Sequence, residues 1–203
     1  MGRLLNKLLE DKGLSLSIII GTYYRFKTLY NKNISAGKRL KIIGGIILDI
    51  RGNAVLRIGE NVLFRSRNRG YHGQLTSKVK IMIDNGGKVD IGSESRVYGA
   101  CIHASKSIQI GSRCLVASNV QIFDRNGHSA EFKHPENRIK SYGEAKAVVI
   151  EDDVWIGTNS VILPGTKIGY GSIVMANSVV KGNFPSKSLI GGVPAKVLKS
   201  HSA

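Results

Sequence analysis

The sequence contains few of the residues that mark several common protein classes. It has 2 cysteines, 4 prolines and an aromatic content of 6% in 203 residues. Two cysteines are too few to hold together a secreted disulfide scaffold of this size. The longest apolar stretch, residues 14–24, is interrupted by Ser and Gly and is too short to span a membrane. The first residues lack the apolar region and cleavage site of a signal peptide, so we expect one globular, cytoplasmic domain.

Acidic residues are also scarce, which leaves a strong excess of positive charge. There are 30 Lys and Arg against 14 Asp and Glu, a formal net charge of +16. The cations concentrate in residues 1–40 and in a second block over residues 65–80. Such blocks suit nucleic acid, an anionic membrane surface, an acidic polymer or a phosphorylated cofactor, and the charge by itself does not choose among them.

A period of six residues governs the second half of the chain. Every sixth residue from 150 to 180 is β-branched and aliphatic, and the residue four positions after each is small or β-branched, except for Phe184. A helix would need apolar residues three and four apart, and a half-buried strand would need them two apart. A period of six therefore predicts a short strand followed by a corner. The aliphatic positions are Ile150, Ile156, Ile162, Ile168, Val174 and Val180.

The same period recurs upstream, from Leu40 to Ile122, with interruptions. We therefore expect an all-β solenoid of about six coils, with three strands in each coil. Strands stacked about 4.8 Å apart would enclose a narrow interior that aliphatic side chains fill and aromatic rings do not. The 24 glycines would serve corners that need a positive φ. Cys101 and Cys114 fall at small, inward positions of the period, which leaves neither thiol available as a nucleophile.

The spacing divides the chain into three segments. Residues 1–39 lie outside the repeat, and their leucine pattern predicts an N-terminal helical cap that closes the solenoid or rests on an anionic inner membrane. Residues 40–184 form the solenoid, and residues 185–203 form a C-terminal closing segment. Two stretches break the period and must leave the coil as loops, residues 65–78 and residues 124–147. Loops held by a rigid scaffold often carry function.

The six uninterrupted hexapeptides, the VWIG motif at residues 154–157 and the GGVPAKVLK motif at residues 191–199 resemble the hexapeptide-repeat acyltransferases. The resemblance spans about residues 40–199 and is strongest to the branch of galactoside, maltose, xenobiotic and bacterial polysaccharide O-acetyltransferases. It implies a left-handed parallel β-helix, acetyl-CoA as the co-substrate, and a homotrimer with active sites between its subunits. The period alone predicts the coil, and only the resemblance gives its hand.

In this family the second loop carries a catalytic histidine, and residues 124–128, which read DRNGH, match its motif. The resemblance therefore implies that His128 is the general base. A hydroxyl is a poor nucleophile at neutral pH, and a neutral imidazole can take its proton and pass it to the leaving thiolate. Asp124, Glu131 or a backbone carbonyl could hold the imidazole, and the sequence leaves this choice open.

The same resemblance assigns further residues to the two substrates. Asn126 within the DRNGH motif and the outward-facing Trp155 would lie near the acceptor. The repeat itself places His103 just before the small residue Ala104, from where its side chain could point outward toward the same cleft. The cofactor would run along the late coils, and its phosphates would meet lysines of the closing segment where the family pattern has arginines. The positions implied for the cofactor are Gly157, Thr158, Ala176, Lys181, Lys196 and Lys199.

The expected function is acetyl-CoA-dependent O-acetylation of a sugar hydroxyl of a bacterial surface polysaccharide or its precursor. Transfer would be direct, in a ternary complex and without a metal, and the basic loop suggests an acidic carbohydrate acceptor. One alternative is a zinc-dependent enzyme of the carbonic-anhydrase type, with His103, His128 and His134 as ligands. Another is a structural solenoid that binds a polyanion or a membrane through charge alone. Nucleic acid is not an expected partner.

Overall fold

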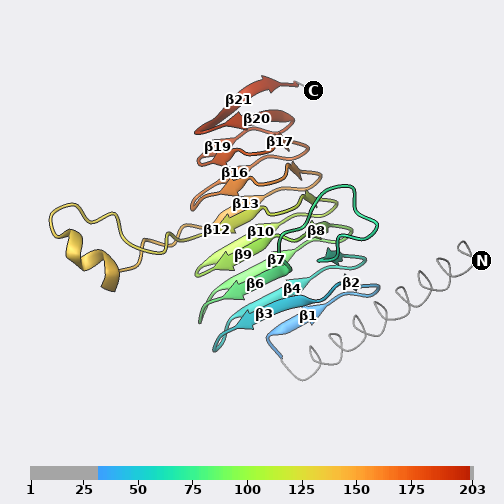
Figure 1. Ribbon diagram of the computed structural model, residues 1–203, viewed down its shortest axis with the longest axis horizontal. Coiled ribbons are helices and arrows are strands. Elements are labelled where there is room, and N and C mark those ends of the chain that lie inside the picture. Colours follow the sequence, from blue (N-terminus) through green and yellow to red (C-terminus); the bar gives the residue numbers. More distant parts are fainter. Residues whose placement is uncertain (1–31, 202–203) are drawn as a thin grey trace, which may run out of the picture.

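The computed structural model describes residues 32–201, which form a stack of short strands wound into a left-handed parallel β-helix (Figure 1). Each turn of the coil contributes one strand to each of three sheets, so neighbours within a sheet are mostly three strands apart in the chain. The all-β solenoid predicted from the six-residue period is therefore confirmed. The predicted N-terminal cap lies, for residues 1–31, outside the described residues.

The sheets are named first, second and third in the order in which the chain enters them. The first sheet contains β1 (Ile34–Ala36), β4 (Val55–Ile58), β7 (Lys88–Ile91), β10 (Ser107–Ile110), β13 (Val148–Ile150), β16 (Lys167–Ile168) and β19 (Asn183–Phe184). The second contains β2 (Lys41–Ile43), β5 (Leu63–Arg65), β8 (Arg96–Tyr98), β11 (Leu115–Val116), β14 (Trp155–Ile156), β17 (Ile173–Val174), β20 (Ser188–Gly192) and β21 (Ala195–Ser200). The third contains β3 (Ile46–Ile50), β6 (Val79–Ile83), β9 (Cys101–Ala104), β12 (Gln121–Phe123), β15 (Val161–Ile162) and β18 (Val179–Val180).

The strand register confirms that three hexapeptides make one coil. Ile150 lies opposite Ile168, and Ile156 lies opposite Val174, so equivalent positions are 18 residues apart. These side chains are buried inside the coil, where each fully buried aliphatic residue contributes about 1.5–3 kcal/mol. The core is therefore one narrow column of stacked aliphatic residues.

Both ends of the solenoid lie beyond the predicted limits. Strand β1 pairs in parallel with β4, so the first coil begins within the segment expected to be the cap. At the other end, Phe184 lies opposite Ile168 and Ile190 lies opposite Val174, which are separations of 16 residues. Two residues are missing from the period here, and Phe184 therefore takes an aliphatic position in its strand. Strand β20 continues the coil to Gly192, and β21 then closes it by antiparallel pairing.

Glycine supports the coil in a way that the sequence only partly predicted. Several glycines do occupy positive φ, but one column of corners uses Asn119, Asn159 and Asn177 at φ 60°, 58° and 58°. Asparagine tolerates this conformation, and the side chains of Asn119 and Asn159 each donate to the next asparagine at 3.2 Å. Other glycines permit close approach of successive coils, since a Cβ on Gly157 would lie 2.5 Å from the backbone N of Ala176.

The two cysteines occupy different environments. Cys114 is buried inside the coil as predicted, and burial raises the pKa of its thiol to about 11. The prediction for Cys101 was wrong, because Ala100 fills the inward position and Cys101 lies half-buried on the outer face of the third sheet. Burial, opposed by the charge of Lys80, raises the pKa of the Cys101 thiol as well. Both residues therefore favour the uncharged thiol, which is a weak nucleophile.

Two loops leave the coil where the period breaks, as predicted. The first loop, residues 66–78, connects β5 to β6, and the second loop, residues 124–147, connects β12 to β13. The second contains the 3₁₀ helix η1 (Pro135–Lys140), which has no buried residue. Figure 1 shows that the first loop (dark green) lies beside the stack and the second (yellow) projects away from it. Within residues 32–201, no helix has the length and apolar character needed to span a membrane.

Candidate active site

A groove with a volume of about 1320 Å³ runs along the outer face of the second sheet. Residues of β5, β8, β11, β14 and β17 line it, and residues 70–74 of the first loop form one of its walls. Trp155, Gly157, Thr158 and Ala176 all lie on this groove. The structure thus brings together three of the positions implied for the cofactor and the tryptophan implied for the acceptor side.

The groove combines a line of apolar side chains with small polar groups. Trp155 is 49% exposed, and its register neighbours Leu115 and Ile173 are exposed on the same face. Beside this line, Thr158 Oγ1 donates a hydrogen bond to the carbonyl oxygen of Ser118 at 2.7 Å. The side-chain hydroxyl of Ser118 is also hydrogen-bonded to the hydroxyl of Thr158. A long, flexible ligand with alternating apolar and amide groups would fit such a surface.

The three lysines assigned to the cofactor are not among the residues that line the groove. Lys196 and Lys199 are exposed on β21, which is the edge strand of the same sheet. Lys181 is exposed just after β18, which belongs to the third sheet. The closing segment therefore shares a sheet with the groove, whereas Lys181 follows a strand of another sheet.

His128 lies in the second loop, and its imidazole is exposed. Its Nδ1 lies 2.7 Å from the carbonyl oxygen of Arg138. Because a carbonyl oxygen can only accept a hydrogen bond, Nδ1 carries the proton, and the neutral imidazole has its free electron pair on Nε2. This geometry leaves Nε2 as a proton acceptor that faces away from the loop backbone contact.

The loop around His128 is held by contacts within itself. Arg138 Nε donates to the carbonyl oxygen of Glu131 at 2.7 Å, and the guanidinium lies 5.5 Å from the ring centre of Phe132. The backbone N of Ser129 donates to the carbonyl oxygen of Ser141 at 3.4 Å, which joins the two limbs of the loop. The carbonyl that orients His128 is therefore fixed by the loop and does not depend on the coil.

Asp124 does not orient His128, which corrects one assignment. Asp124 is fully buried, and its carboxylate accepts hydrogen bonds from the backbone N of Ser105 and of Lys106, both at 2.7 Å. The residue ties the start of the second loop to the neighbouring coil. Among the three partners considered for His128, the structure therefore selects a backbone carbonyl.

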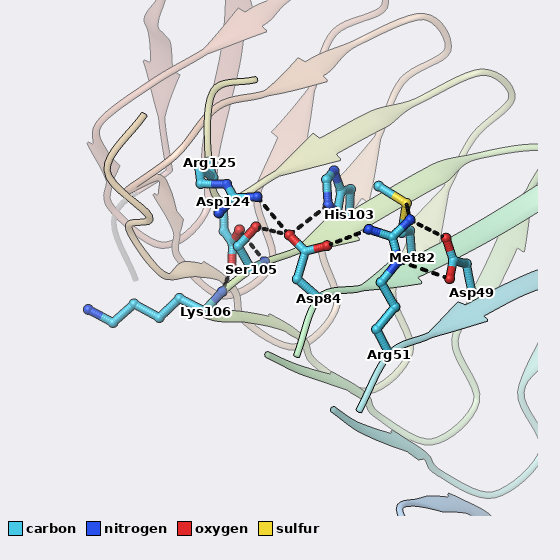
Figure 2. Close-up of polar contacts among 9 residues, drawn as sticks. All are labelled: Asp49, Arg51, Met82, Asp84, His103, Ser105, Lys106, Asp124 and Arg125. Atoms are coloured by element: carbon cyan, nitrogen blue, oxygen red, sulfur yellow. Dashed lines mark hydrogen bonds and ion pairs between the residues drawn. The ribbon is translucent and has the colours of Figure 1, made fainter. Parts of the chain in front are cut away.

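His103 belongs to a polar cluster on the outer face of the third sheet, centred on Asp84 (Figure 2). The Asp84 carboxylate accepts hydrogen bonds from His103 Nε2 at 3.3 Å, Ser105 Oγ at 2.7 Å and Arg125 Nη2 at 2.8 Å. Arg51 Nη1 approaches its other oxygen at 3.3 Å. Burial disfavours the charged form of Asp84, but the contacts with Ser105, His103 and Arg125 together outweigh burial and lower its pKa.

Sequence reasoning missed Asp84 and Arg125. Arg125 stands inside the DRNGH motif that was used to assign His128, so its place in the chain already pointed to this region. Asp84 precedes Asn85, the polar residue that interrupts the upstream period. An interruption of the repeat beside a carboxylate was the available signal.

A second cavity, of about 370 Å³, adjoins this cluster. His103 and Asn126, both assigned to the acceptor side, line it together with Phe123, Gly127 and Tyr142, and Arg125 stacks over the Tyr142 ring at 4.5 Å. This cavity and the groove share no lining residue. Within one chain, the assigned residues that line a cavity therefore form two sets, one on the second sheet and one at the base of the second loop.

The zinc alternative required His103, His128 and His134 to converge. His103 instead contacts Asp84, His128 contacts the Arg138 carbonyl, and His134 lies 3.4 Å from Glu136. Across residues 32–201, no group of three or more His, Cys, Asp or Glu side chains has the geometry to hold a metal ion.

The coil, its three sheets and its outer groove define a left-handed β-helix protein built from hexapeptide repeats. Residues 147–182 match the bacterial transferase hexapeptide (six repeats) family. WbbJ of Escherichia coli (strain K12), named for O-acetyl transfer in lipopolysaccharide biosynthesis, is 36% identical over 166 residues, which cover 75% of this chain and 76% of WbbJ. The chain therefore belongs to the hexapeptide-repeat acetyltransferases.

Solved structures show the same fold. A hexapeptide-repeat acetyltransferase of Vibrio cholerae, VCA0836, superposes with a TM-score of 0.58 and 24% identity, covering 96% of this chain and 91% of that one. The N-acyltransferase AntD of Bacillus cereus, solved with dTDP and coenzyme A, gives a TM-score of 0.63 and 21% identity, covering 87% of this chain and 89% of that one.

Proposed function

We propose that this protein is an acetyl-CoA-dependent O-acetyltransferase that modifies a sugar hydroxyl of a bacterial surface polysaccharide or its precursor. The observation that carries the proposal is His128, whose Nδ1–H is bound by a backbone carbonyl so that Nε2 can accept a proton. The name of the relative WbbJ supports O-acetylation and a surface polysaccharide. Because acetyl-CoA is a cytoplasmic metabolite, the reaction would take place in the cytoplasm.

The groove is the proposed site of the co-substrate. The pantetheine arm would lie along Trp155, Gly157, Thr158 and Ala176, where apolar side chains and small polar groups alternate. The absence of a Cβ at Gly157 lets successive coils approach closely beneath the groove. The phosphates would extend toward the edge strand β21, where Lys196 and Lys199 are exposed, and Lys181 is the remaining candidate contact. VCA0836 was solved with acetyl-CoA, which is consistent with this choice.

His128 would act as the general base in a direct transfer. Its Nε2 takes the proton of the acceptor hydroxyl while the oxygen attacks the thioester carbonyl, so a C–O bond forms and the C–S bond breaks. The proton then passes from Nε2 to the leaving thiolate, which yields free CoA. The Arg138 carbonyl stabilises the imidazolium through Nδ1–H. The raised thiol pKa of Cys101 and of Cys114 argues against an acyl-cysteine intermediate.

We further propose a homotrimer in which His128 of one subunit faces the groove of a neighbour. The groove and the cavity at the base of the second loop share no lining residue, and the second loop projects from the stack (Figure 1). A second copy of the chain would supply the missing half of each site, with His103 and Asn126 on the acceptor side. Contact of residues 1–39 with an anionic inner membrane is a separate proposal, and residues 1–31 lie outside the described part of the chain.

A thiol-release assay tests the proposed function. Acetyl-CoA is incubated with the protein and with neutral glycans, acidic glycans or aminoglycosides, and free CoA is measured. We expect acceptor-dependent CoA release with at least one glycan and an O-acetyl ester in the product. Release with aminoglycosides alone, giving an amide product, would instead assign N-acetylation.

A further inference from the structure

We propose that one end of the groove binds an anionic group of the acceptor, so that the acceptor is an acidic sugar or a diphosphate-linked sugar. This end, called the basic end below, consists of Arg65, Tyr71, His72, Arg96 and Tyr98. The inference rests on the proposed function and specifies the class of the second substrate.

The charge of the groove is of one sign. Its lining includes Arg65 and Arg96 and contains no Asp or Glu. Within residues 32–201, Arg65 and Arg96 form no ion pair, whereas Arg113 and Arg125 each contact an aspartate. Arg65 uses Nη1 to donate to the carbonyl oxygen of Arg69 at 2.9 Å, which leaves other N–H groups free. Two guanidinium groups without a carboxylate partner in the lining of a groove favour an anionic ligand.

The position of the basic end argues against the phosphates of CoA as its ligand. Arg96 lies on β8, whereas Lys196 and Lys199 lie on β21, five strands further along the second sheet. At a strand spacing of about 4.8 Å, the two cationic regions are separated by roughly 24 Å. If the lysines hold the CoA phosphates, the thioester lies between the two regions, and the basic end faces the acceptor.

The first loop, which contributes Tyr71 and His72 to the basic end, is held in place. Tyr71 stacks on Tyr98 with ring centres 4.7 Å apart and an interplanar angle of 18°, which fixes the first loop against the sheet. Asn68 bonds through both side-chain atoms to the backbone of Leu75, and Thr76 Oγ1 donates to Asn119 Oδ1 at 2.7 Å. Tyrosine rings present flat apolar faces that pack against sugar rings, and arginine provides the planar fork that matches a carboxylate or phosphate.

Two sources can supply the anionic group. One is the carboxylate of an acidic sugar, and the other is the diphosphate of a nucleotide or lipid carrier attached to the sugar. Both offer oxygen atoms that accept paired hydrogen bonds from a guanidinium. The experiment therefore includes one probe for each source and a neutral probe of the same sugar.

Equilibrium dialysis measures binding of three probes to the full chain: methyl glucuronide, UDP-glucose and the neutral methyl glucoside. We expect at least one anionic probe to bind about tenfold more tightly than the neutral probe, as one charge-assisted hydrogen bond predicts. Preference for the glucuronide assigns a sugar carboxylate, and preference for UDP-glucose assigns a diphosphate. Equal binding of all three probes, including no measurable binding of any, overturns the inference.

The double variant Arg65→Gln/Arg96→Gln locates the effect. We expect it to lose the preference for the anionic probe while the Kd for acetyl-CoA stays unchanged. The matched control is Arg69→Gln, which removes a cation of the first loop that lies outside the groove lining and should keep the preference. A double variant that keeps the preference, or that loses acetyl-CoA binding instead, overturns the inference. Acetyl-CoA binding by the wild type is read in the same dialysis, so failure of the proposed function is seen separately.

Discussion

The two loops that interrupt the hexapeptide repeat differ in how the coil holds them. The first loop, residues 66–78, packs against the stack: Tyr71 stacks on Tyr98, and Thr76 donates a hydrogen bond to Asn119. This loop forms one wall of the groove. The second loop, residues 124–147, is fixed mainly at its base by buried Asp124. Its far part leaves large apolar side chains in solvent, with Phe132 82% exposed and Ile139 79% exposed.

The two loops therefore add two features that the repeat lacks: a shaped binding surface on the coil and a side chain held away from the coil. A coil of stacked strands presents flat faces, so a loop that folds back adds shape and charge to a face, whereas a loop that projects can deliver a side chain elsewhere. The first loop therefore shapes a binding surface on its own chain. The second loop carries His128, which does not line the groove of its own chain, and in the proposed homotrimer this residue would face the groove of a neighbour.

The largest expected effect concerns the projecting loop. His128→Ala should lower kcat by about 10²–10⁴, because the acceptor hydroxyl loses its general base, and should leave the Kd for acetyl-CoA unchanged. Thiol release measures kcat, and equilibrium dialysis measures Kd. The control is His134→Ala in the same loop, where the exposed imidazole lies 3.4 Å from Glu136 and activity should stay within about twofold of wild type. Full activity of the His128 variant would remove this residue from the mechanism.

The next effect concerns the base of the second loop. Asp124→Ala leaves the backbone N–H groups of Ser105 and Lys106 without an acceptor, and we expect the free energy of unfolding to fall by about 3 kcal/mol. Urea denaturation measures the loss. The control Asp90→Ala removes a partly exposed carboxylate that pairs with Arg57 and Lys88 and should cost less than about 1 kcal/mol. Equal losses in the two variants contradict the anchoring role of Asp124.

A smaller effect is expected in the first loop. Asn68→Ala removes the side-chain bridge to the Leu75 backbone, which should cost about 1–2 kcal/mol locally and raise amide hydrogen exchange across residues 66–78. The KM for the acceptor should rise a few-fold, while kcat, which depends on His128, stays unchanged. Unaltered exchange in this loop would contradict the role of Asn68 in holding it. A fall in kcat with no change in KM would contradict the role of the loop in binding the acceptor.

The smallest effect is a pH dependence at the cluster that joins the third sheet to the second loop. The pKa of Asp84 is lowered in the folded protein, so its contribution to stability is present above the ordinary aspartate pKa of about 4 and is lost as pH falls through the lower folded value. The difference in Tm between wild type and Asp84→Asn should therefore shrink between pH 5 and about pH 3. A difference that stays constant over this range contradicts the charged role of Asp84.

The coil could be predicted because each hexapeptide repeats the same local contacts, so one period fixes both the strand and its place in the stack. The prediction was wrong for Cys101 and placed the end of the coil too early, at residue 184, because a change in the residue spacing moves a side chain to another face or position. The hand of the coil came only from the family resemblance, since the period is the same for either hand.

The site was less predictable than the coil. Trp155 and Thr158 lie within the regular repeat, and the structure places both on the groove. The partner of His128 and the burial of Asp124 depend on loop conformation, which no period describes. The Asp84 cluster joins residues from separate coils through spacings that depart from 18, so the sequence alone could not bring them together.

A complementation experiment tests most directly whether the projecting loop and the groove of different copies form one active site. Each of two variants, His128→Ala and Ala176→Trp, should be inactive alone, since one lacks the base and the other has its groove filled. When the two variants are co-expressed in equal amounts, they form mixed trimers in which each site takes His128 from one subunit and the groove from a neighbour. Because each of these is intact in about half of the subunits, about one quarter of the sites would combine an intact His128 with an intact groove. We expect recovery of about a quarter of wild-type CoA release. Mixed oligomers that remain inactive would contradict it.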